Sequence, residues 1–361
     1  SSDLGGSDLD LGWGIAVSGD LVYVVGETKS ANFPGMTGTV TGTDIFAAAL
    51  NATGSGVRYV TRLGGNGADT AAGVAVEGLD AYLVGTTTSS DLPGSGCGGL
   101  ASARLVVAKL NSTGAPAYTT CLGDVDFTVV GYGIAVRSGA AYVTGETGPV
   151  VGVARDVIVA KYNPDGTLGG GIPIAGSGDE WSSGIAVDGP GNIYLTGTTM
   201  SATDFPVTSG TAAWGGGASD AFVLKLSSAF GITFATYLGG SGDDYGAAIA
   251  VDTVQAFYVT GTTTSTNFPV STGAYDTSQN GGLDLFVARM HLGSSAPNKV
   301  TYATYLGAGN EDWAYSAATD TGTQAFVTGS SASSAALDST NALVARLKVG
   351  IPPAAPVVSI A

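Results

Sequence analysis

The hexapeptide YVTGET at residues 142–147 has five related copies elsewhere in the chain. The other copies are YVVGET (23–28), YLVGTT (82–87), YLTGTT (194–199), YVTGTT (258–263) and FVTGSS (326–331). Repetition of one short motif along a chain is typical of an array of similar structural units. We therefore predict that the chain is built from six copies of one unit.

Three further motifs accompany each copy. A run such as GIAV (184–187) precedes it, a run such as DAFVLKL (220–226) follows it, and a turn such as YLGGSGDD (237–244) ends the unit. These runs are bounded by Gly, Asn or Asp and are too short for helices of ordinary length, which indicates β-strands. Four short strands in each of six units predict an all-β fold, a single six-bladed β-propeller of four-stranded blades.

The two chain ends suggest how such a ring would close. The last unit lacks the acidic turn at its C-terminal end, whereas the chain starts with LGGSDLD (4–10) directly before the first GIAV. We therefore predict that the N-terminal segment joins the last blade. The predicted propeller is 1–349, with blades at approximately 14–72, 73–132, 133–183, 184–247, 248–315, and 316–349 plus 1–13, followed by a Pro-rich tail or linker at 350–361.

The outer strand of the last blade is incomplete in sequence, because no strand precedes LGGSD at the N-terminus. The tail GIPPAAPVVSIA (350–361), a strand of a partner chain or residues upstream of this chain would complete it. A strand passed between subunits makes a head-to-tail contact that can build a filament. The tail residues that would form this contact are Pro352, Pro353, Pro356, Val357, Val358 and Ile360.

The composition excludes several classes of partner. Thirteen Lys and Arg residues stand against 29 Asp and Glu residues, which gives a formal net charge of -16. Such a chain repels phosphate backbones and anionic lipid surfaces, so we expect no nucleic acid partner. No apolar run approaches the roughly 20 residues that span a bilayer, and we expect no membrane insertion. The start SSDLGG, without an initiator Met, leads us to expect a mature secreted protein.

The segments GIAVDGPGNIYLTGTT (184–199), DFP (204–206), DAFVLKL (220–226) and TYLGGSGDD (236–244) together resemble the bacterial β-propeller repeat called SBBP. The resemblance covers nearly the whole chain and is weakest in the third and sixth units. It implies a secreted or surface-exposed prokaryotic protein, often one module of a larger architecture. It implies no catalytic residues, and we predict that the chain is not an enzyme.

The longest loops should lie on one face, because the loop after the second strand and the loop after the fourth strand emerge together in such a blade. A ligand would be sought there first. The candidate contact residues are Phe33, Phe205, Phe268, Trp214 and Asp220. For the Phe-Pro pairs we favour a second interpretation, in which each Phe pins its loop to its own blade. Aromatic residues before the GIAV motif, such as Trp13 and Tyr132, either stack on sugar rings or, as we favour, pack between blades.

The acidic turns are candidates for a calcium site, because carboxylates in Gly-rich turns can bind Ca²⁺. The residues concerned are Asp243, Asp244, Glu311 and Asp312. No stretch matches an EF-hand loop, and Asp commonly caps turns by bonding to its own backbone, so we favour the structural interpretation and expect no cofactor.

Cys97 and Cys121 should lie on the same face of the second blade. We expect a disulfide there, formed in an oxidising compartment, with two buried thiols as the alternative. These patterns favour a non-catalytic extracellular or cell-surface scaffold for assembly or adhesion, whose partner is a second copy or a neighbouring surface domain. The alternative is a carbohydrate-binding module or a glycan-active enzyme that uses the long-loop face.

Overall fold

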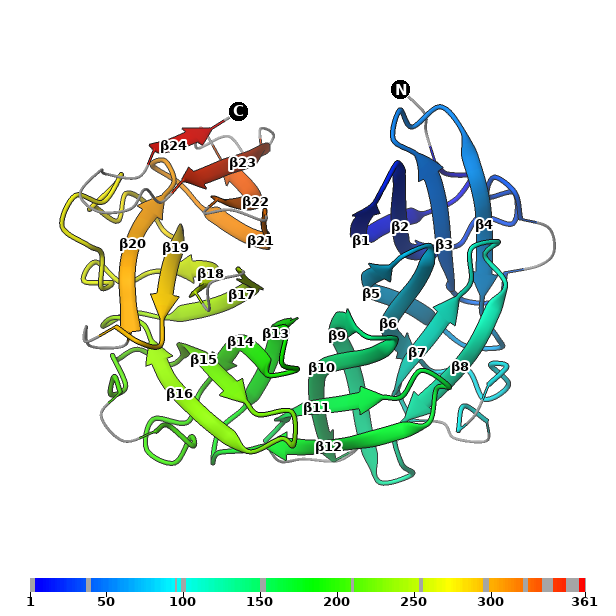
Figure 1. Cartoon of the computed structure of the whole chain (residues 1–361), viewed down its shortest axis with the longest axis horizontal. Coiled ribbons are helices and arrows are strands. Elements are labelled where there is room, and N and C mark those ends of the chain that lie inside the picture. Colours follow the sequence, from blue (N-terminus) through cyan, green and yellow to red (C-terminus); the bar gives the residue numbers. More distant parts are fainter. Residues whose placement is uncertain are drawn as a thin grey trace. The chain divides into compact units, whose positions relative to one another are not determined.

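The computed structural model describes residues 4–36, 40–94, 96–98, 102–149, 154–208, 211–252, 256–294, 299–320, 324–332, 340–348 and 357–360. In this part of the chain, 24 strands form six antiparallel sheets of four strands each (Figure 1). Each sheet is a β-propeller blade whose strands follow one another in chain order, so the predicted all-β fold of six four-stranded blades is confirmed. The chain divides into two compact units of three blades, Ser1–Pro173 and Ile174–Ala361.

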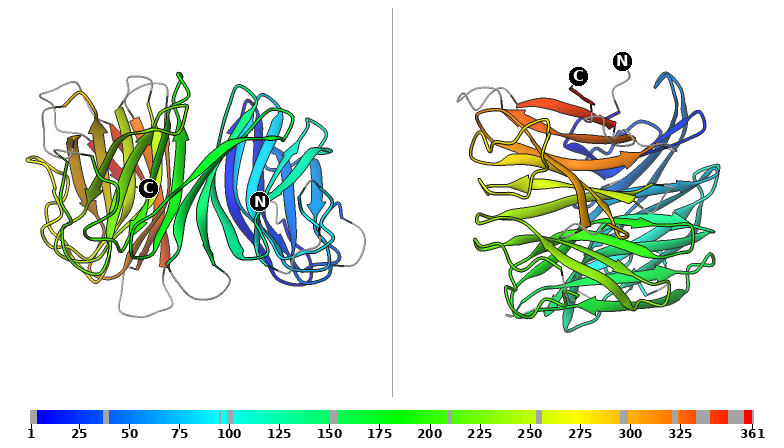
Figure 2. Two further views of the ribbon diagram at one scale, coloured as in Figure 1. Left: turned by 90° about the horizontal axis from the view of Figure 1, so that it is seen from below. Right: turned by 60° about the vertical axis from the view of Figure 1, so that its left-hand side comes forward.

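Unit 1 contains blades 1 to 3. Their strands are β1 (Asp10–Ser18), β2 (Leu21–Thr28), β3 (Asp44–Asn51), β4 (Val57–Leu63), β5 (Asp69–Glu77), β6 (Asp80–Thr87), β7 (Arg104–Leu110), β8 (Pro116–Leu122), β9 (Phe127–Arg137), β10 (Ala140–Pro149), β11 (Asp156–Tyr162) and β12 (Leu168–Ile174). The strands of each blade lie side by side as a sheet in all views (Figure 2).

Unit 2 contains blades 4 to 6. Their strands are β13 (Glu180–Val187), β14 (Ile193–Thr199), β15 (Asp220–Leu226), β16 (Ile232–Leu238), β17 (Asp244–Val251), β18 (Ala256–Thr263), β19 (Asp284–His291), β20 (Val300–Leu306), β21 (Asp312–Thr319), β22 (Gln324–Ala332), β23 (Thr340–Lys348) and β24 (Val357–Ile360). No helix long and apolar enough to cross a membrane occurs among the residues described.

In blades 2, 4 and 5 the second and third strands are buried on both faces along most of their length. In blade 4 every residue of β14 is buried, and β15 has a single half-buried position at Lys225. One reason is that the next blade covers them. Tyr258 and Val287 of blade 5 share a buried cluster with Ala314 on the first strand of blade 6. This packing accounts for the nearly continuous apolar character of the two motifs.

The first strand of every blade contains a β-bulge. The register between the first and second strands shifts by one residue in all six sheets, which leaves one extra residue in the first strand. The bulged residues are Trp13, Ala72, Tyr132, Ser183, Ala247 and Tyr315. A bulge bends its strand and turns a side chain away from the regular alternation.

The bulge explains the glycine of the hexapeptide. A Cβ on Gly197 would overlap the carbonyl oxygen of Trp181, the second residue before the bulge, and would lie 2.9 Å from the Phe222 ring. The corresponding glycine of blade 1, Gly26, would overlap the carbonyl oxygen of Leu11 in the same way. Only glycine allows the two backbones to come this close.

The described residues do not show the N-terminal segment joined to the last blade. The segment is bonded to the loop of blade 1, since the Ser7 N–H donates to Asn32 at 2.9 Å and the Asp8 N–H donates to Ser30 at 2.8 Å. The turn between blades 4 and 5 makes the same two bonds, from the Ser241 N–H to Asn267 and from the Gly242 N–H to Ser265, so these are the contacts of a turn between two blades.

The C-terminal tail supplies the outer strand of the last blade. Strand β24 pairs with β23 in antiparallel register, with Lys348 opposite Val357 and Ala345 opposite Ile360. Among the three ways to complete this blade, the structure thus contains the one in which the chain's own tail folds back. Val358 lies in the same strand, whereas Pro352, Pro353 and Pro356 lie outside the described residues.

Candidate functional site

The acidic residue at the start of a first strand fastens two loops to each other. In blade 5, Asp244 accepts hydrogen bonds from the Gly240 N–H and the Ser265 hydroxyl, both at 2.8 Å. The Ser265 oxygen accepts in turn from the Gly242 N–H at 2.8 Å. The turn that follows the fourth strand of blade 4 is thereby fixed to the loop that follows the second strand of blade 5.

The same arrangement recurs along the chain. The acids and their hydroxyl donors are Asp10 with Thr28 and Ser30, Asp69 with Thr87 and Ser89, and Glu180 with Thr199 and Ser201. In blade 6, Asp312 accepts from the Ala308 N–H at 2.8 Å. These carboxylates satisfy hydroxyl groups and backbone N–H groups of the loops, which explains why the acids repeat with the blades.

The Phe-Pro pairs of the long loops face their own blades. Phe33, Phe205 and Phe268 are at most 3% exposed. Each packs against a third-strand phenylalanine, with ring centroids 4.4 to 4.9 Å apart; the partners are, in order, Phe46, Phe222 and Phe286. These three residues are therefore buried and are not surface contacts. Burial of each aromatic ring stabilises its loop against the blade.

Trp214 and Asp220 are also not exposed contacts. Trp214 is half-buried and packs edge-on against Tyr237 at a centroid distance of 5.5 Å. Asp220 is fully buried and accepts a hydrogen bond from the Gly215 N–H at 2.6 Å. Both residues hold the loop of blade 4 onto its sheet.

A tyrosine of the fourth strand anchors the long loop in unit 2. The Tyr237 hydroxyl donates to the Ser201 carbonyl at 2.7 Å, and the Tyr305 hydroxyl donates to the Ser265 carbonyl at 2.6 Å. These tyrosines belong to the repeated TYLG motif, in which blade 2 has Cys121 instead.

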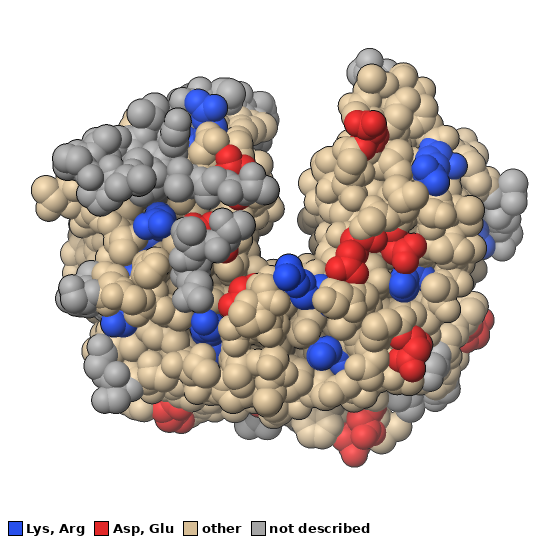
Figure 3. All heavy atoms as spheres, in the orientation of Figure 1, with Lys and Arg blue, Asp and Glu red and all other residues tan. Residues whose placement is uncertain are grey.

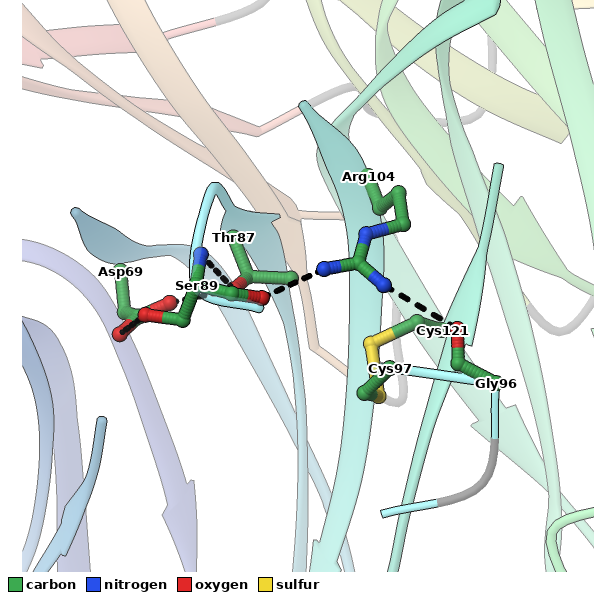
Figure 4. The surroundings of a disulfide bond; sticks show 7 residues. All are labelled: Asp69, Thr87, Ser89, Gly96, Cys97, Arg104 and Cys121. Carbon is green, nitrogen blue, oxygen red and sulfur yellow. Dashed lines mark hydrogen bonds between the residues drawn. A yellow bond between two sulfur atoms is a disulfide. The ribbon is translucent and has the colours of Figure 1, made fainter. Parts of the chain in front are cut away.

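Blade 2 replaces the tyrosine anchor with a disulfide and a buried arginine. The expected disulfide between Cys97 and Cys121 is present, and its sulfur atoms are 2.03 Å apart. Beside it, the Arg104 guanidinium donates to the Ser89 carbonyl at 2.5 Å and to the Gly96 carbonyl at 3.4 Å (Figure 4). Arg104 thus takes over the bond that a tyrosine makes in blades 4 and 5.

Sequence reasoning did not single out Arg104. The signal was nevertheless present, because RLVVAKL begins with Arg where four of the other third-strand motifs begin with Asp. Arg104 is fully buried, and this burial lowers the pKa of its guanidinium, while the Asp69 carboxylate opposes the shift.

Two carboxylates meet at the end of the fourth strand of blade 4. Asp220 Oδ1 and Asp244 Oδ2 lie 2.5 and 2.6 Å from the point that a Cβ on Gly239 would occupy. Both residues are fully buried, and the Oδ1 atom of each has no hydrogen-bond partner. Burial, with the Asp244 and Asp243 charges as further causes, raises the pKa of Asp220 to about 7.

Blade 5 repeats the pair with Asp284 and Asp312. Burial and the nearby Asp312 charge raise the pKa of Asp284 to about 6. The other calcium candidates are less suited to a cation, since Glu311 is exposed and Asp243 accepts from the Ala218 N–H at 2.6 Å. Among the described residues, no three Asp, Glu, His or Cys side chains come together to hold a metal ion.

The raised pKa of Asp220 predicts a pH dependence of stability. A folded-state pKa of about 7, above the ordinary value of 3.8, means that the folded chain binds this proton more tightly. The resulting stabilisation is complete below pH 3.8 and is lost as the pH rises through 7. We expect Asp220→Asn to stabilise the protein at pH 8 by about 1 to 2 kcal/mol, and not at pH 4.

Urea denaturation of wild type and Asp220→Asn at both pH values checks this prediction. Asp20→Asn, at an exposed turn, is the matched control. Equal destabilisation by Asp220→Asn at both pH values would contradict it. Adding Ca²⁺ at pH 8 tests the calcium hypothesis in the same assay, because an ion held by Asp220 and Asp244 would stabilise the wild type and not the variant.

The first strand of blade 1 carries an exposed apolar surface. On the first strand of blade 1, Ile15 is 70% and Val17 63% exposed. The corresponding residue of blade 5, Ile249, is 5% exposed, because blade 4 packs against it. On the molecular face shown in Figure 3, charged side chains are scattered and uncharged residues form most of the surface.

Comparison with solved structures gives fold-level similarities only. The puromycin hydrolase S511A mutant complexed with PGG matches at 12% identity and a TM-score of 0.47, over 96% of this chain and 54% of that one. The chain thus spans about half the length of that hydrolase. The β-propeller domain of the Trilobed protease from Pyrococcus furiosus matches at 8% identity and a TM-score of 0.46, over 94% of this chain and 82% of that one.

Hydrazine synthase from Kuenenia stuttgartiensis matches at 10% identity and a TM-score of 0.46, over 89% of this chain and 93% of that one. At such values these similarities say nothing about activity.

No curated protein sequence matches the chain. Residues 168–206 and 233–269 match the family model of the SBBP beta-propeller repeat. The first segment spans the outer strand of blade 3 and the first two strands of blade 4, and the second spans the outer strand of blade 4 and the first two strands of blade 5. Both segments match as SBBP beta-propeller repeats.

Proposed function

We propose that the chain is a non-catalytic extracellular or cell-surface scaffold that associates with a second copy of itself through the blade faces at its two ends. The observation that carries this proposal is the exposed first-strand face of blade 1, formed by Ile15 and Val17. Exposed apolar sheet faces of this kind mark sites of protein association. The disulfide between Cys97 and Cys121 is consistent with an oxidising, extracellular location.

The partner surface has the character of another blade. In unit 2, the face that covers a first strand carries Tyr258 and Val287 of blade 5. The equivalent residues of blade 6, Phe326 and Val344, are 38% and 41% exposed. A second copy of the chain therefore offers a surface of the type that covers first strands elsewhere, and such a contact is head-to-tail.

The experiment compares the mass in solution of three chains by light scattering during size-exclusion chromatography. We expect concentration-dependent oligomers for the wild type, and monomers for Ile15→Glu, because a buried unpaired charge is costly. A chain ending at Lys348 lacks β24 and should still associate. If the truncated chain alone is monomeric, the tail is the intersubunit strand. If the wild type is monomeric at every concentration, the proposal fails.

A further inference from the structure

A cavity of about 320 Å³ lies in unit 1, at the first strands of its three blades. These strands, β1, β5 and β9, lie next to one another along the inner edge of the unit (Figure 1). The cavity is lined by two aromatic residues, Trp13 and Tyr132, and by three polar residues, Glu27, Thr70 and Thr86. It is separate from the long loops that the sequence singled out.

The β-bulges shape this cavity. Trp13 and Tyr132 are the bulged residues of blades 1 and 3, and the bulged residue between them is Ala72 of blade 2. An alanine at this position leaves room between the two aromatic rings. Bulges of this kind turn side chains toward binding sites. The Trp13 side chain is 59% exposed, so a ligand can reach it.

The polar groups of the cavity come from neighbouring strands. Glu27 and Thr86 occupy the same position in the second strands of blades 1 and 2, after the glycine of the hexapeptide. The Thr86 hydroxyl accepts a hydrogen bond from the Gly131 N–H at 3.3 Å, and its own proton is still available for donation to a ligand. Burial and the Glu146 carboxylate raise the pKa of Tyr132 to about 12, so its phenol stays neutral.

We propose that this cavity binds a neutral saccharide of one or two rings. A sugar ring has an apolar face of C–H groups, which packs on aromatic rings such as Trp13, and hydroxyl edges that donate to a carboxylate such as Glu27. The net charge of -16 disfavours an anionic ligand. The volume lies near the lower end of the range of about 300 to 1,000 Å³ for small-molecule sites, which suits one or two rings.

Unit 2 provides a matched control. Its bulged residues are Ser183, Ala247 and Tyr315, so that it lacks the two aromatic residues on either side of an alanine. Tyr315 is 62% exposed, which is similar to Trp13. A saccharide that uses the unit 1 cavity should not depend on Tyr315.

The test is isothermal titration calorimetry of the full chain with a panel of neutral mono- and disaccharides, each at up to about 10 mM. We expect at least one sugar to bind, and to quench the tryptophan fluorescence. Trp13→Ala should weaken its binding about tenfold or more, as truncation of an aromatic contact commonly does. Glu27→Gln should weaken it several-fold, and Tyr315→Ala should leave it unchanged.

Two results would overturn the proposal. One is that no sugar of the panel binds to a wild-type chain whose circular dichroism shows it to be folded. The other is binding that Trp13→Ala and Glu27→Gln leave unchanged. Because Trp13 and Glu27 are not fully buried, both variants should fold. The oligomeric state of each variant is measured alongside, so that failure of sugar binding is distinguished from failure of the proposed self-association.

Discussion

Replacing Gly197 with alanine is expected to lower the free energy of unfolding by about 3 kcal/mol or more. The added methyl group would overlap the carbonyl oxygen of Trp181 and press against the Phe222 ring. Neither neighbour can move easily, because Trp181 is held in the ladder between β13 and β14 and Phe222 packs against Phe205. Urea denaturation followed by circular dichroism measures the loss.

Gly12→Ala is the matched control for this experiment. Gly12 also lies in a strand next to a bulge, but a Cβ there would meet only a Val24 methyl group at 3.8 Å, which is an ordinary contact. We expect this variant to remain within about 0.5 kcal/mol of the wild type. If Gly197→Ala is as stable as the wild type, the close approach of the two backbones does not explain the glycine of the hexapeptide.

Removing the disulfide, by changing Cys97 and Cys121 to alanine, should cost about 3 kcal/mol. The two residues are 24 positions apart, and the cross-link restricts the unfolded chain over that loop. Removal of the disulfide also releases the loop that carries Gly96, whose carbonyl is one of the two that accept hydrogen bonds from buried Arg104. Thermal unfolding with and without a reducing agent measures the effect.

A reducing agent should lower the melting temperature of the wild type to that of the double alanine variant and leave the variant unchanged. Equal melting temperatures for the oxidised wild type and the variant would show that Arg104 and its contacts hold this loop without the disulfide. The comparison therefore distinguishes the contribution of the disulfide from that of Arg104, the two features that replace the tyrosine anchor in blade 2.

The repeat predicted the blades because each of its motifs has the residue pattern that one strand or turn requires. Alternating short runs such as GIAV specify strands, and their order along the chain specifies the order within each sheet. The same logic led to the disulfide, since Cys97 and Cys121 lie in a loop and a strand end that emerge on one face. It also provided, as one of two interpretations, the burial of Phe205 against its own blade.

Other features depend on contacts between segments that the motifs do not specify. LGGSD makes the bonds to Ser30 and Asn32 that the turn between blades 4 and 5 makes to Ser265 and Asn267, and the motif by itself does not specify the strand that precedes it. Trp214 looked exposed because its loop does not repeat, yet it packs on Tyr237.

The chain by itself therefore determined the unit, its four strands and its sixfold repetition, since these follow from hydrophobic pattern and turn residues. Tertiary structure alone decided that the tail completes the last blade, that Arg104 is buried beside the disulfide, and that Trp13 and Tyr132 line one cavity. Bulges displace those aromatic side chains from the regular alternation, and neighbouring blades bring them together. Such placements arise from packing between strands, which no single stretch of sequence encodes.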